Sequence, residues 1–190
     1  RREEVAEMRW EDVAFRWNKI IIRDKVEGER TIPLPPYVAS LLRHLQAINE
    51  AGLENVRPLP GADDRRATVP AWKPSPWVFR SARATAARHI TPNATHDRAT
   101  AAAGLPPLTL HGLRRSFGSL AEWTETPAGV VAQIMGHKPS ATVEKHYRVR
   151  PLDLLRTWHT KLEGWILEQA GIDQPIEAAD GPILRAVSSR

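Results

Sequence analysis

Apolar residues recur at intervals of three and four along much of the chain, which is the pattern of helices that bury one face. The three clearest stripes are Val38, Leu41, Leu42, Leu45 and Ile48; Leu110, Leu113, Phe117 and Leu120; and Leu154, Leu155, Trp158, Leu162, Trp165 and Ile166. The first stripe predicts a helix over residues 37–51, and the third predicts one over residues 152–170. The pattern therefore favours a mainly helical protein.

Residues that begin and end helices predict further ones. Thr91 can cap a helix that ends before Gly104, and Thr126 can cap a shorter one that ends at Gly136. Threonine suits the first position because its hydroxyl accepts a backbone N–H, and glycine suits the last because it adopts the left-handed conformation freely. Another helix is already under way at Arg1. These boundary residues agree with the apolar stripes on a mainly helical chain.

Three short segments near the start of the chain lack this helical spacing. Residues 13–17, 19–23 and 31–34 are rich in β-branched and aromatic side chains, which favour strands. Between the second and third segments, residues 24–29 form a turn in which Gly28 is free to take a positive φ angle. The expected fold class is therefore mainly α with a small three-stranded antiparallel β-sheet (α+β).

Two stretches show little periodicity of any kind. Residues 52–76 hold several prolines and the charged run at 63–66, which predicts a long irregular connection. Residues 171–190 mix proline, glycine, alanine and serine, which predicts a flexible tail. We therefore expect one domain over residues 1–170, followed by this tail. The chain opens on two arginines without an initiator methionine, so we expect it to be part of a longer protein.

Composition narrows the class of protein. The 190 residues carry 27 basic and 22 acidic side chains, a net charge of +5 and a sequence pI of about 10.0, which favours a polyanionic partner. Cysteine is absent, which excludes disulfides and thiolate metal sites and suits a reducing cytosol. No apolar run is long enough to span a membrane, and the first residues are charged, so we expect a cytoplasmic protein.

Candidate chemistry is concentrated between residues 108 and 147. His111 and Arg114 stand three residues apart, so they are neighbours on one helix surface and can reach the same small target. His137 follows the helix stop at Gly136, and Tyr147 comes ten residues later. Cationic donors together with one oxygen nucleophile suit the chemistry of a phosphate group.

These residues resemble the signature of the tyrosine recombinases of the phage integrase family. The resemblance rests on His111-Gly-Leu-Arg114, on Met135-Gly136-His137 and on Tyr147 within Lys-His-Tyr-Arg. Two stretches extend it towards the start of the chain: RREEVAEMRWEDVAF is similar to the first box of the family, and IIIRDKVEGERTIPL is similar to its β-hairpin. Because the boxes follow the family order from Arg1 to the helix after Pro151, the match is more specific than any single motif.

The resemblance implies the fold of a DNA breaking and rejoining catalytic domain, and it assigns roles to six residues. Its catalytic set is Arg1, Lys25, His111, Arg114, His137 and Tyr147. Tyr147 would be the nucleophile that forms a 3′-phosphotyrosyl bond with DNA, and Lys25 would protonate the departing 5′ oxygen. Arg1 would clamp the phosphate, with Glu4 orienting its guanidinium through a hydrogen bond. These cations take the place of a metal, so neither a metal nor another cofactor is expected.

Further basic residues are candidates for contacts with the DNA backbone. They are Arg80, Arg83, Arg88, Arg115, Lys138 and Arg148. From the residues alone, a solvated charged face explains the first three equally well. The resemblance implies a double-stranded DNA attachment site as partner, accessory DNA-bending or excision factors, and a location at the nucleoid of a bacterium. It also implies a tetramer of the full-length protein on DNA, in which the tail over residues 171–190 is a candidate contact between protomers, with the present chain monomeric on its own.

The expected function is site-specific recombination, through which a mobile element is integrated or excised. Two other functions stay open on the sequence: a type IB topoisomerase, which uses similar residues and the same phosphotyrosine, and a regulatory DNA-binding descendant without catalysis. The Met-Gly-His box favours the recombinase over the topoisomerase. The complete catalytic set argues against a protein that has lost its activity.

Overall fold

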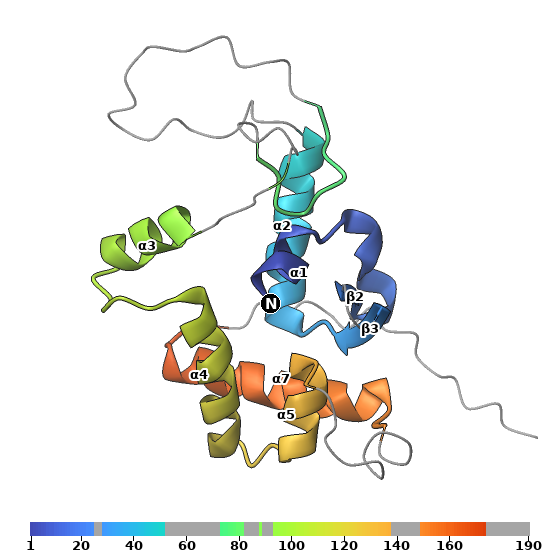
Figure 1. The fold of residues 1–190 in the computed structure, drawn as a ribbon, viewed down its shortest axis with the longest axis vertical. Helices are drawn as coiled ribbons and strands as arrows, with labels where there is room; N and C mark the ends of the chain where they lie inside the picture. Colours follow the sequence, from blue (N-terminus) through green and yellow to red (C-terminus); the bar gives the residue numbers. More distant parts are fainter. Residues whose placement is uncertain (25–27, 52–72, 82–87, 89–92, 138–148, 174–190) are drawn as a thin grey trace, which may run out of the picture.

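The computed structural model describes residues 1–24, 28–51, 73–81, 88, 93–137 and 149–173. Its helices are α1 (Arg2–Ala6), α2 (Pro36–Ala51), α3 (Asn93–Ala102), α4 (Leu110–Trp123), α5 (Ala128–Met135) and α7 (Leu152–Gln169), with short 3-10 turns η1 (Trp10–Asp12) and η2 (Phe15–Trp17). The strands β1 (Val13–Ala14), β2 (Lys19–Asp24) and β3 (Gly28–Pro33) form one antiparallel sheet in that order. Figure 1 shows the sheet beside α2, with α4, α5 and α7 gathered below both. The expected fold class is confirmed.

The sheet differs from the expected one in the lengths of its strands. The first strand ends at Ala14 rather than at residue 17, because residues 15–17 form η2 and Asn18 takes a left-handed conformation with φ 44°. Asparagine tolerates that conformation better than most residues, and here it turns the chain directly into β2. The third strand begins at Gly28 rather than at residue 31. Gly28 has a φ angle of 83°, which confirms the positive value expected at this residue.

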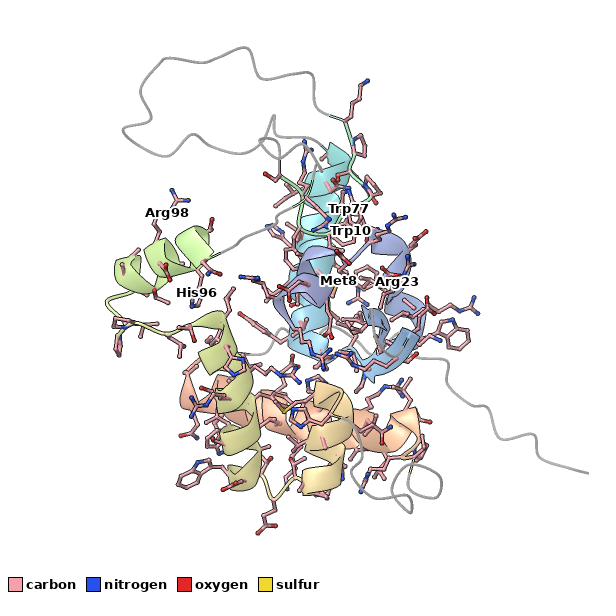
Figure 2. The ribbon with its side chains drawn as sticks, in the orientation of Figure 1. Met8, Trp10, Arg23, Trp77, His96 and Arg98 are labelled. Carbon is pink, nitrogen blue, oxygen red and sulfur yellow. The ribbon has the colours of Figure 1, made fainter. Side chains whose placement is uncertain are left out.

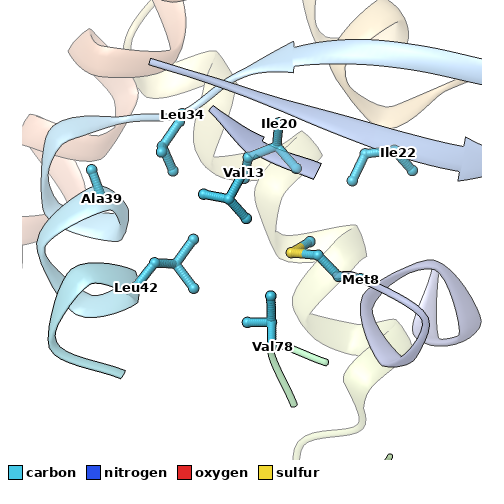
Figure 3. Close-up of a cluster of buried hydrophobic side chains, with 8 residues drawn as sticks. All are labelled: Met8, Val13, Ile20, Ile22, Leu34, Ala39, Leu42 and Val78. Carbon is cyan, nitrogen blue, oxygen red and sulfur yellow. The ribbon is translucent and has the colours of Figure 1, made fainter. Parts of the chain in front are cut away.

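The first core cluster lies between the sheet and α2, as Figure 3 shows. Its buried members are Met8, Val13, Ile20, Ile22, Leu34, Ala39, Leu42 and Val78. Two backbone hydrogen bonds bring the distant residues 76–78 into this cluster. The Val78 N–H donates to the Met8 carbonyl at 3.0 Å, and the Trp10 N–H donates to the Pro76 carbonyl at 3.1 Å. Residues 77–79 therefore anchor the chain by packing.

Helix α2 buries only part of its predicted apolar stripe: Leu42 belongs to the first core cluster, and Leu45 packs against it. Val38 and Leu41 were expected to be buried, yet they are 37% and 52% exposed, while Ala39 is 2% exposed. Asn49 is also buried on this face, because its amide both donates to and accepts from the Ser75 backbone at 3.0 Å. A buried polar side chain that is fully paired in this way does not oppose folding.

A second core cluster joins α4, α5 and α7. Its buried members are Val130, Ile134 and Leu155, with Phe117 and Trp158 packed against them. On α7 the buried positions include Leu155, Leu162 and Leu167, whereas Leu154 from the predicted stripe is 41% exposed. Although α7 is 18 residues long, none of the helices described is long and apolar enough to cross a membrane.

A buried carboxylate on α7 binds the first turn of α2. Glu163 on α7 accepts hydrogen bonds from the backbone N–H groups of Tyr37 at 2.9 Å and Val38 at 3.1 Å, in the first turn of α2. These N–H groups have no partner within the helix, so a carboxylate there both caps the helix and interacts favourably with its dipole. Burial raises the pKa of Glu163, and the two backbone bonds oppose that rise. The start of α2 is thereby tied to α7.

Candidate active site

A pocket of about 910 Å³ lies between α1, α4 and the start of α3. Three of the predicted catalytic residues, Arg1, His111 and Arg114, line this pocket. Its apolar wall is formed by Val5, Ala6, Phe79, Leu110 and Leu113. The structure therefore brings the first predicted arginine, at one end of the sequence, to the same cavity as the His-x-x-Arg pair more than a hundred residues later.

The first turn of α4 presents His111 and Arg114 to the pocket. Thr109 caps this helix, and its hydroxyl accepts the N–H of Gly112 at 2.9 Å. Leu113, which was expected to belong to the buried stripe, is 44% exposed and faces the pocket instead. Phe117, one turn later on the same face, packs into the second core cluster, so this face of α4 lines the pocket at its start and meets the core further along.

Helix α3 is held against the chain segment that precedes α4. The ring of His96, labelled in Figure 2, has its Nε2 atom 2.6 Å from the Leu108 carbonyl oxygen. Asn93 and Thr95, from the first turn of the same helix, line the pocket. This contact between α3 and residue 108 completes the pocket wall opposite α1.

Arg114 also reaches the turn that carries His137. Its Nη2 atom donates a hydrogen bond of 2.5 Å to the Met135 carbonyl, at the end of α5. Gly136 then takes the expected left-handed conformation, with φ 67°, and the His137 N–H donates to the Ala132 carbonyl at 2.8 Å. The Arg114 guanidinium therefore binds the backbone two residues before His137.

The start of α5 differs from the expected one by a single residue. Thr126 does not cap this helix; Pro127 occupies the cap position, and no side chain makes a capping bond there. The Thr126 hydroxyl lies 2.7 Å from the hydroxyl of Thr124, which is buried. The Thr124 hydroxyl also donates to the Ala121 carbonyl at 3.0 Å, so the two threonines stabilise the turn that precedes α5.

Two contacts hold the Glu4 carboxylate. One of its oxygens accepts a bond of 2.7 Å from the backbone nitrogen of Arg1. The carboxylate also binds the guanidinium of Arg30 on β3, whose Nη1 and Nη2 atoms donate at 3.2 and 2.7 Å. Glu4 therefore joins the start of α1 to the sheet. The expected bond from the Arg1 guanidinium stays a prediction.

Arg30 was not among the predicted site residues, although a sequence signal for it exists. It pairs with Ile22 across the hairpin, next to the pair of Ile20 with Ile32, so it lies on the sheet face that carries the core. Side chains alternate between the two faces of a strand, so Arg30 is in phase with the apolar residues Ile32 and Leu34. A charged residue at an inward position generally has a specific partner.

The charges at this site interact strongly. Burial lowers the pKa of the Arg114 guanidinium; Glu4 opposes this effect, and the positive charges of Arg1 and Arg30 add to it. Burial raises the pKa of Glu4, but the bonds from Arg30 and from the Arg1 amine outweigh it and lower that pKa to about 2. The Arg114 guanidinium thus feels the positive charges of Arg1 and Arg30 and the negative charge of Glu4. Such an arrangement is electrostatically suited to an added anion such as a phosphodiester.

Glu4 is expected to make the stability of the fold depend on acidic pH. Its pKa is about 2 in the folded protein against an ordinary value of 4.5, so its contribution is complete above about pH 4.5 and is lost as the pH falls towards 2. We expect this loss to reach up to about 3 kcal/mol in the free energy of unfolding. Urea unfolding at stepped pH measures it. Glu4→Gln should lack this part of the pH dependence, and an identical profile in that variant would contradict the prediction.

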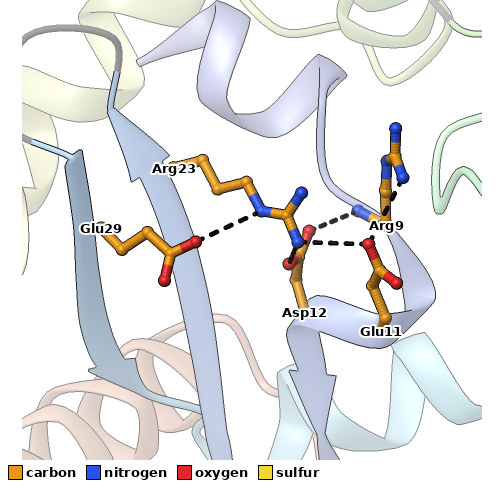
Figure 4. Close-up of polar contacts among 5 residues, drawn as sticks. All are labelled: Arg9, Glu11, Asp12, Arg23 and Glu29. Atoms are coloured by element: carbon orange, nitrogen blue, oxygen red, sulfur yellow. Dashed lines mark hydrogen bonds and ion pairs between the residues drawn. The ribbon is translucent and has the colours of Figure 1, made fainter.

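A second group of charges fixes the end of β2, as Figure 4 shows. The buried carboxylate of Asp12 accepts a bond of 3.0 Å from the Arg9 backbone N–H and one of 2.7 Å from Nη2 of Arg23. The Arg23 guanidinium also pairs with Glu11 at 3.2 Å and lies 3.8 Å from Glu29 on β3. The predicted catalytic lysine, Lys25, follows Arg23 by two residues and lies outside the described part of the chain.

Two of the candidate DNA-contacting arginines have partners within the fold. Nη1 of Arg80 donates to the Lys73 carbonyl at 3.2 Å. Nη2 of Arg88 pairs with Glu7 at 3.0 Å, and its guanidinium lies over the Trp77 ring, 5.6 Å from the ring centre. Both residues therefore help to hold the chain, and their contact with DNA stays a prediction.

Of the remaining predicted residues, one is exposed on α4 and the others lie outside the described part of the chain. Arg115 lies exposed on α4, next to Arg114. The predicted nucleophile Tyr147, together with Arg83, Lys138 and Arg148, lies outside the described residues, as does Lys25. Of the six predicted catalytic residues, the structure therefore describes Arg1, His111, Arg114 and His137.

Comparison with known proteins gives this geometry a context. The model of the phage integrase family matches residues 1–151. The chain is also similar to the prophage integrase IntF of Escherichia coli strain K12, with 53% identity over 172 residues. That alignment covers 90% of this chain and 33% of the relative, so the chain spans about a third of the relative's length. The match extends over α1, the sheet and the elements that carry the pocket, and on this ground the chain belongs to the phage integrase family.

Proposed function

We propose that this chain is the catalytic domain of a site-specific tyrosine recombinase, which cuts and rejoins DNA to integrate or excise a mobile element. The observation that carries the proposal is the convergence of Arg1, His111 and Arg114 on one pocket, although more than a hundred residues separate Arg1 from the other two. Membership of the phage integrase family supports the same reading. The substrate is double-stranded DNA, and the full-length protein acts as a tetramer on it.

In this mechanism Tyr147 attacks a phosphodiester of the DNA backbone. Its phenolic oxygen forms a bond to phosphorus, the bond from phosphorus to the 5′ oxygen breaks, and the products are a 3′-phosphotyrosyl ester and a 5′ hydroxyl. The phenol has an ordinary pKa near 10, so its proton must be removed, and His111 is the proposed acceptor. Lys25 supplies the proton that the 5′ oxygen needs. A 5′ hydroxyl from a second strand reverses the steps and completes the exchange.

The arginines stabilise the transition state of this transfer. Negative charge builds up on the non-bridging oxygens as phosphorus becomes five-coordinate, and Arg1 and Arg114 can each offer two parallel N–H donors to those oxygens. His137 donates a further hydrogen bond. The tie from Arg114 to the Met135 carbonyl supports this assignment, because it places that guanidinium beside the turn that carries His137.

Covalent trapping tests the proposal. The chain is incubated at low salt with nicked duplexes from its attachment region, since a nick lets the short cleaved strand diffuse away and prevents rejoining. We expect a protease-sensitive complex joined to a 3′ phosphate on a denaturing gel, and we expect Tyr147→Phe to lack it. A complex of the same yield with Tyr147→Phe would exclude Tyr147 as the nucleophile.

Sequence preference separates recombination from simple relaxation of DNA. A recombinase forms the covalent complex on duplexes from the attachment region and not on scrambled duplexes of equal length and composition. Equal yields on both, together with relaxation of an unrelated supercoiled plasmid, would favour a topoisomerase.

A further inference from the structure

Arg30 makes two contacts that tie separate parts of the proposed site together. Its guanidinium binds the Glu4 carboxylate through both terminal nitrogens, at 3.2 and 2.7 Å. The same group lies against the backbone of Gly136, where an added Cβ atom would come within 2.6 Å of Arg30 Cζ. One side chain on β3 therefore contacts both the start of α1 and the turn that ends α5.

The pair of Arg30 and Glu4 is well placed to hold a fixed geometry. The Arg30 side chain is 22% exposed and that of Glu4 is 8% exposed, so water screens the pair much less than it screens a surface ion pair. Two parallel N–H donors also fix the orientation of the guanidinium plane relative to the carboxylate, which a single ammonium group cannot do. Gly136 in turn gives that plane room, because it has no side chain.

Each contact of Arg30 leads to a residue of the proposed mechanism. Glu4 binds the backbone amine of Arg1 at 2.7 Å, and Gly136 directly precedes His137. The Met135 carbonyl on the other side of Gly136 accepts the bond from Arg114. Arg30 itself is not among the described residues that line the pocket, so its effect on the reaction would pass through these neighbours.

We propose that Arg30 is a positioning residue, which sets the start of α1 with Arg1 at a fixed distance from the turn that carries His137. The inference rests on the proposed function, because it assigns Arg30 to the same site. In this role the Arg30 guanidinium does not contact the phosphate. It holds together the start of α1 and the turn after α5, which are far apart along the chain and which both carry phosphate-binding residues in the proposed mechanism.

The first test measures single-turnover formation of the covalent complex on the nicked duplexes described above. Arg30→Met is expected to slow it by about 10- to 100-fold, because small displacements of catalytic groups have effects of that size. Arg30→Lys, which keeps the charge and loses the two-point bond, should fall between Arg30→Met and the parent protein. Arg156→Met is the control, since Arg156 pairs with Asp153 on α7 and is not among the residues that line the pocket. A rate for Arg30→Met equal to that of the control would overturn the proposal.

A neutral substrate separates positioning from direct contact with the phosphate. Replacing one non-bridging oxygen of the scissile phosphate with a methyl group removes the negative charge that an arginine would neutralise. A variant that lacks a phosphate-binding arginine, such as Arg114→Ala, should regain much of its lost rate relative to the parent on this substrate. Arg30→Met should regain none. Recovery by Arg30→Met to the extent shown by Arg114→Ala would make Arg30 a phosphate ligand and overturn the positioning role.

A measurement independent of activity keeps the inference distinct from the proposed function. NMR of the chain without DNA follows the titration of Glu4 and the amide hydrogen exchange of His137, in the parent, in Arg30→Met and in Arg30→Lys. We expect the pKa of Glu4 to rise from about 2 towards or above its ordinary 4.5 in Arg30→Met, and the His137 amide to exchange at least several-fold faster. If the parent forms no covalent complex, the proposed function fails while this experiment still decides the role of Arg30. Unchanged values for both groups would refute it.

Discussion

Arg114→Lys is expected to lower the rate of covalent complex formation by about 10²- to 10³-fold. Lysine keeps the positive charge, so any loss reports the geometry of the guanidinium. Arg114 lines the pocket and at the same time donates to the Met135 carbonyl at 2.5 Å, and a single ammonium group cannot make that bond and offer two parallel donors to a phosphate. We therefore expect a large loss of rate from a substitution that conserves charge.

Single-turnover cleavage of nicked duplexes measures this effect, and circular dichroism with thermal unfolding shows whether the fold is kept. Arg43→Lys provides the matched control, because it makes the same chemical change at an exposed position on α2. Binding of the duplex should weaken much less than the rate falls, since the interaction is strongest in the transition state. A rate for Arg114→Lys within a few-fold of the parent would remove Arg114 from the phosphate site.

Leu155→Ala is expected to lower the free energy of unfolding by about 2–5 kcal/mol. Leu155 is 1% exposed and belongs to the cluster in which α7 meets α5 and α4. Removing its branched side chain loses apolar burial and leaves a cavity among side chains from three helices. Because α5 ends in the turn with Gly136 and His137, the same cavity should also loosen that side of the proposed site.

Urea unfolding followed by tryptophan fluorescence measures the loss of stability. Leu154→Ala is the matched control, because the neighbouring leucine on the same helix is 41% exposed, and its truncation should cost less than about 1 kcal/mol. Equal losses in the two variants would show that the face of α7 is assigned wrongly. A larger loss for Leu154→Ala would show that this helix is turned in the opposite sense.

The type and order of the elements could be predicted from local sequence. Helices α2 and α7 start and end within one residue of the predicted positions, because their apolar spacing is regular over four or more turns. Gly28 and Gly136 take the positive φ angles expected of them, since only local backbone geometry decides those angles. The strand boundaries were less accurate: the chain turns at Asn18 after a strand of two residues, which is too short for an alternating pattern to reveal.

Periodicity could not determine which face of a helix meets the core. Val38, Leu41 and Leu113 fall on regular apolar stripes and are nevertheless exposed, since neighbouring elements cover adjacent positions instead. Leu113 is turned towards a pocket, where apolar surface is common next to convergent polar groups. Two polar residues are buried on these helices: Asn49 on α2 and Glu163 on α7 each satisfy backbone groups of another segment of the chain.

Motif order and the helical spacing of His111 and Arg114 are local properties of the chain, so they were enough to predict the family, the fold class and the residue types of the proposed site. Which of these residues meet, and which others support them, depends on how distant segments pack. Packing brings Arg1 to the pocket that Arg114 lines, and it places the Glu4 carboxylate against the guanidinium of Arg30 on β3. A buried charge takes the partner that packing places within reach, and packing between distant segments is not encoded in residue spacing.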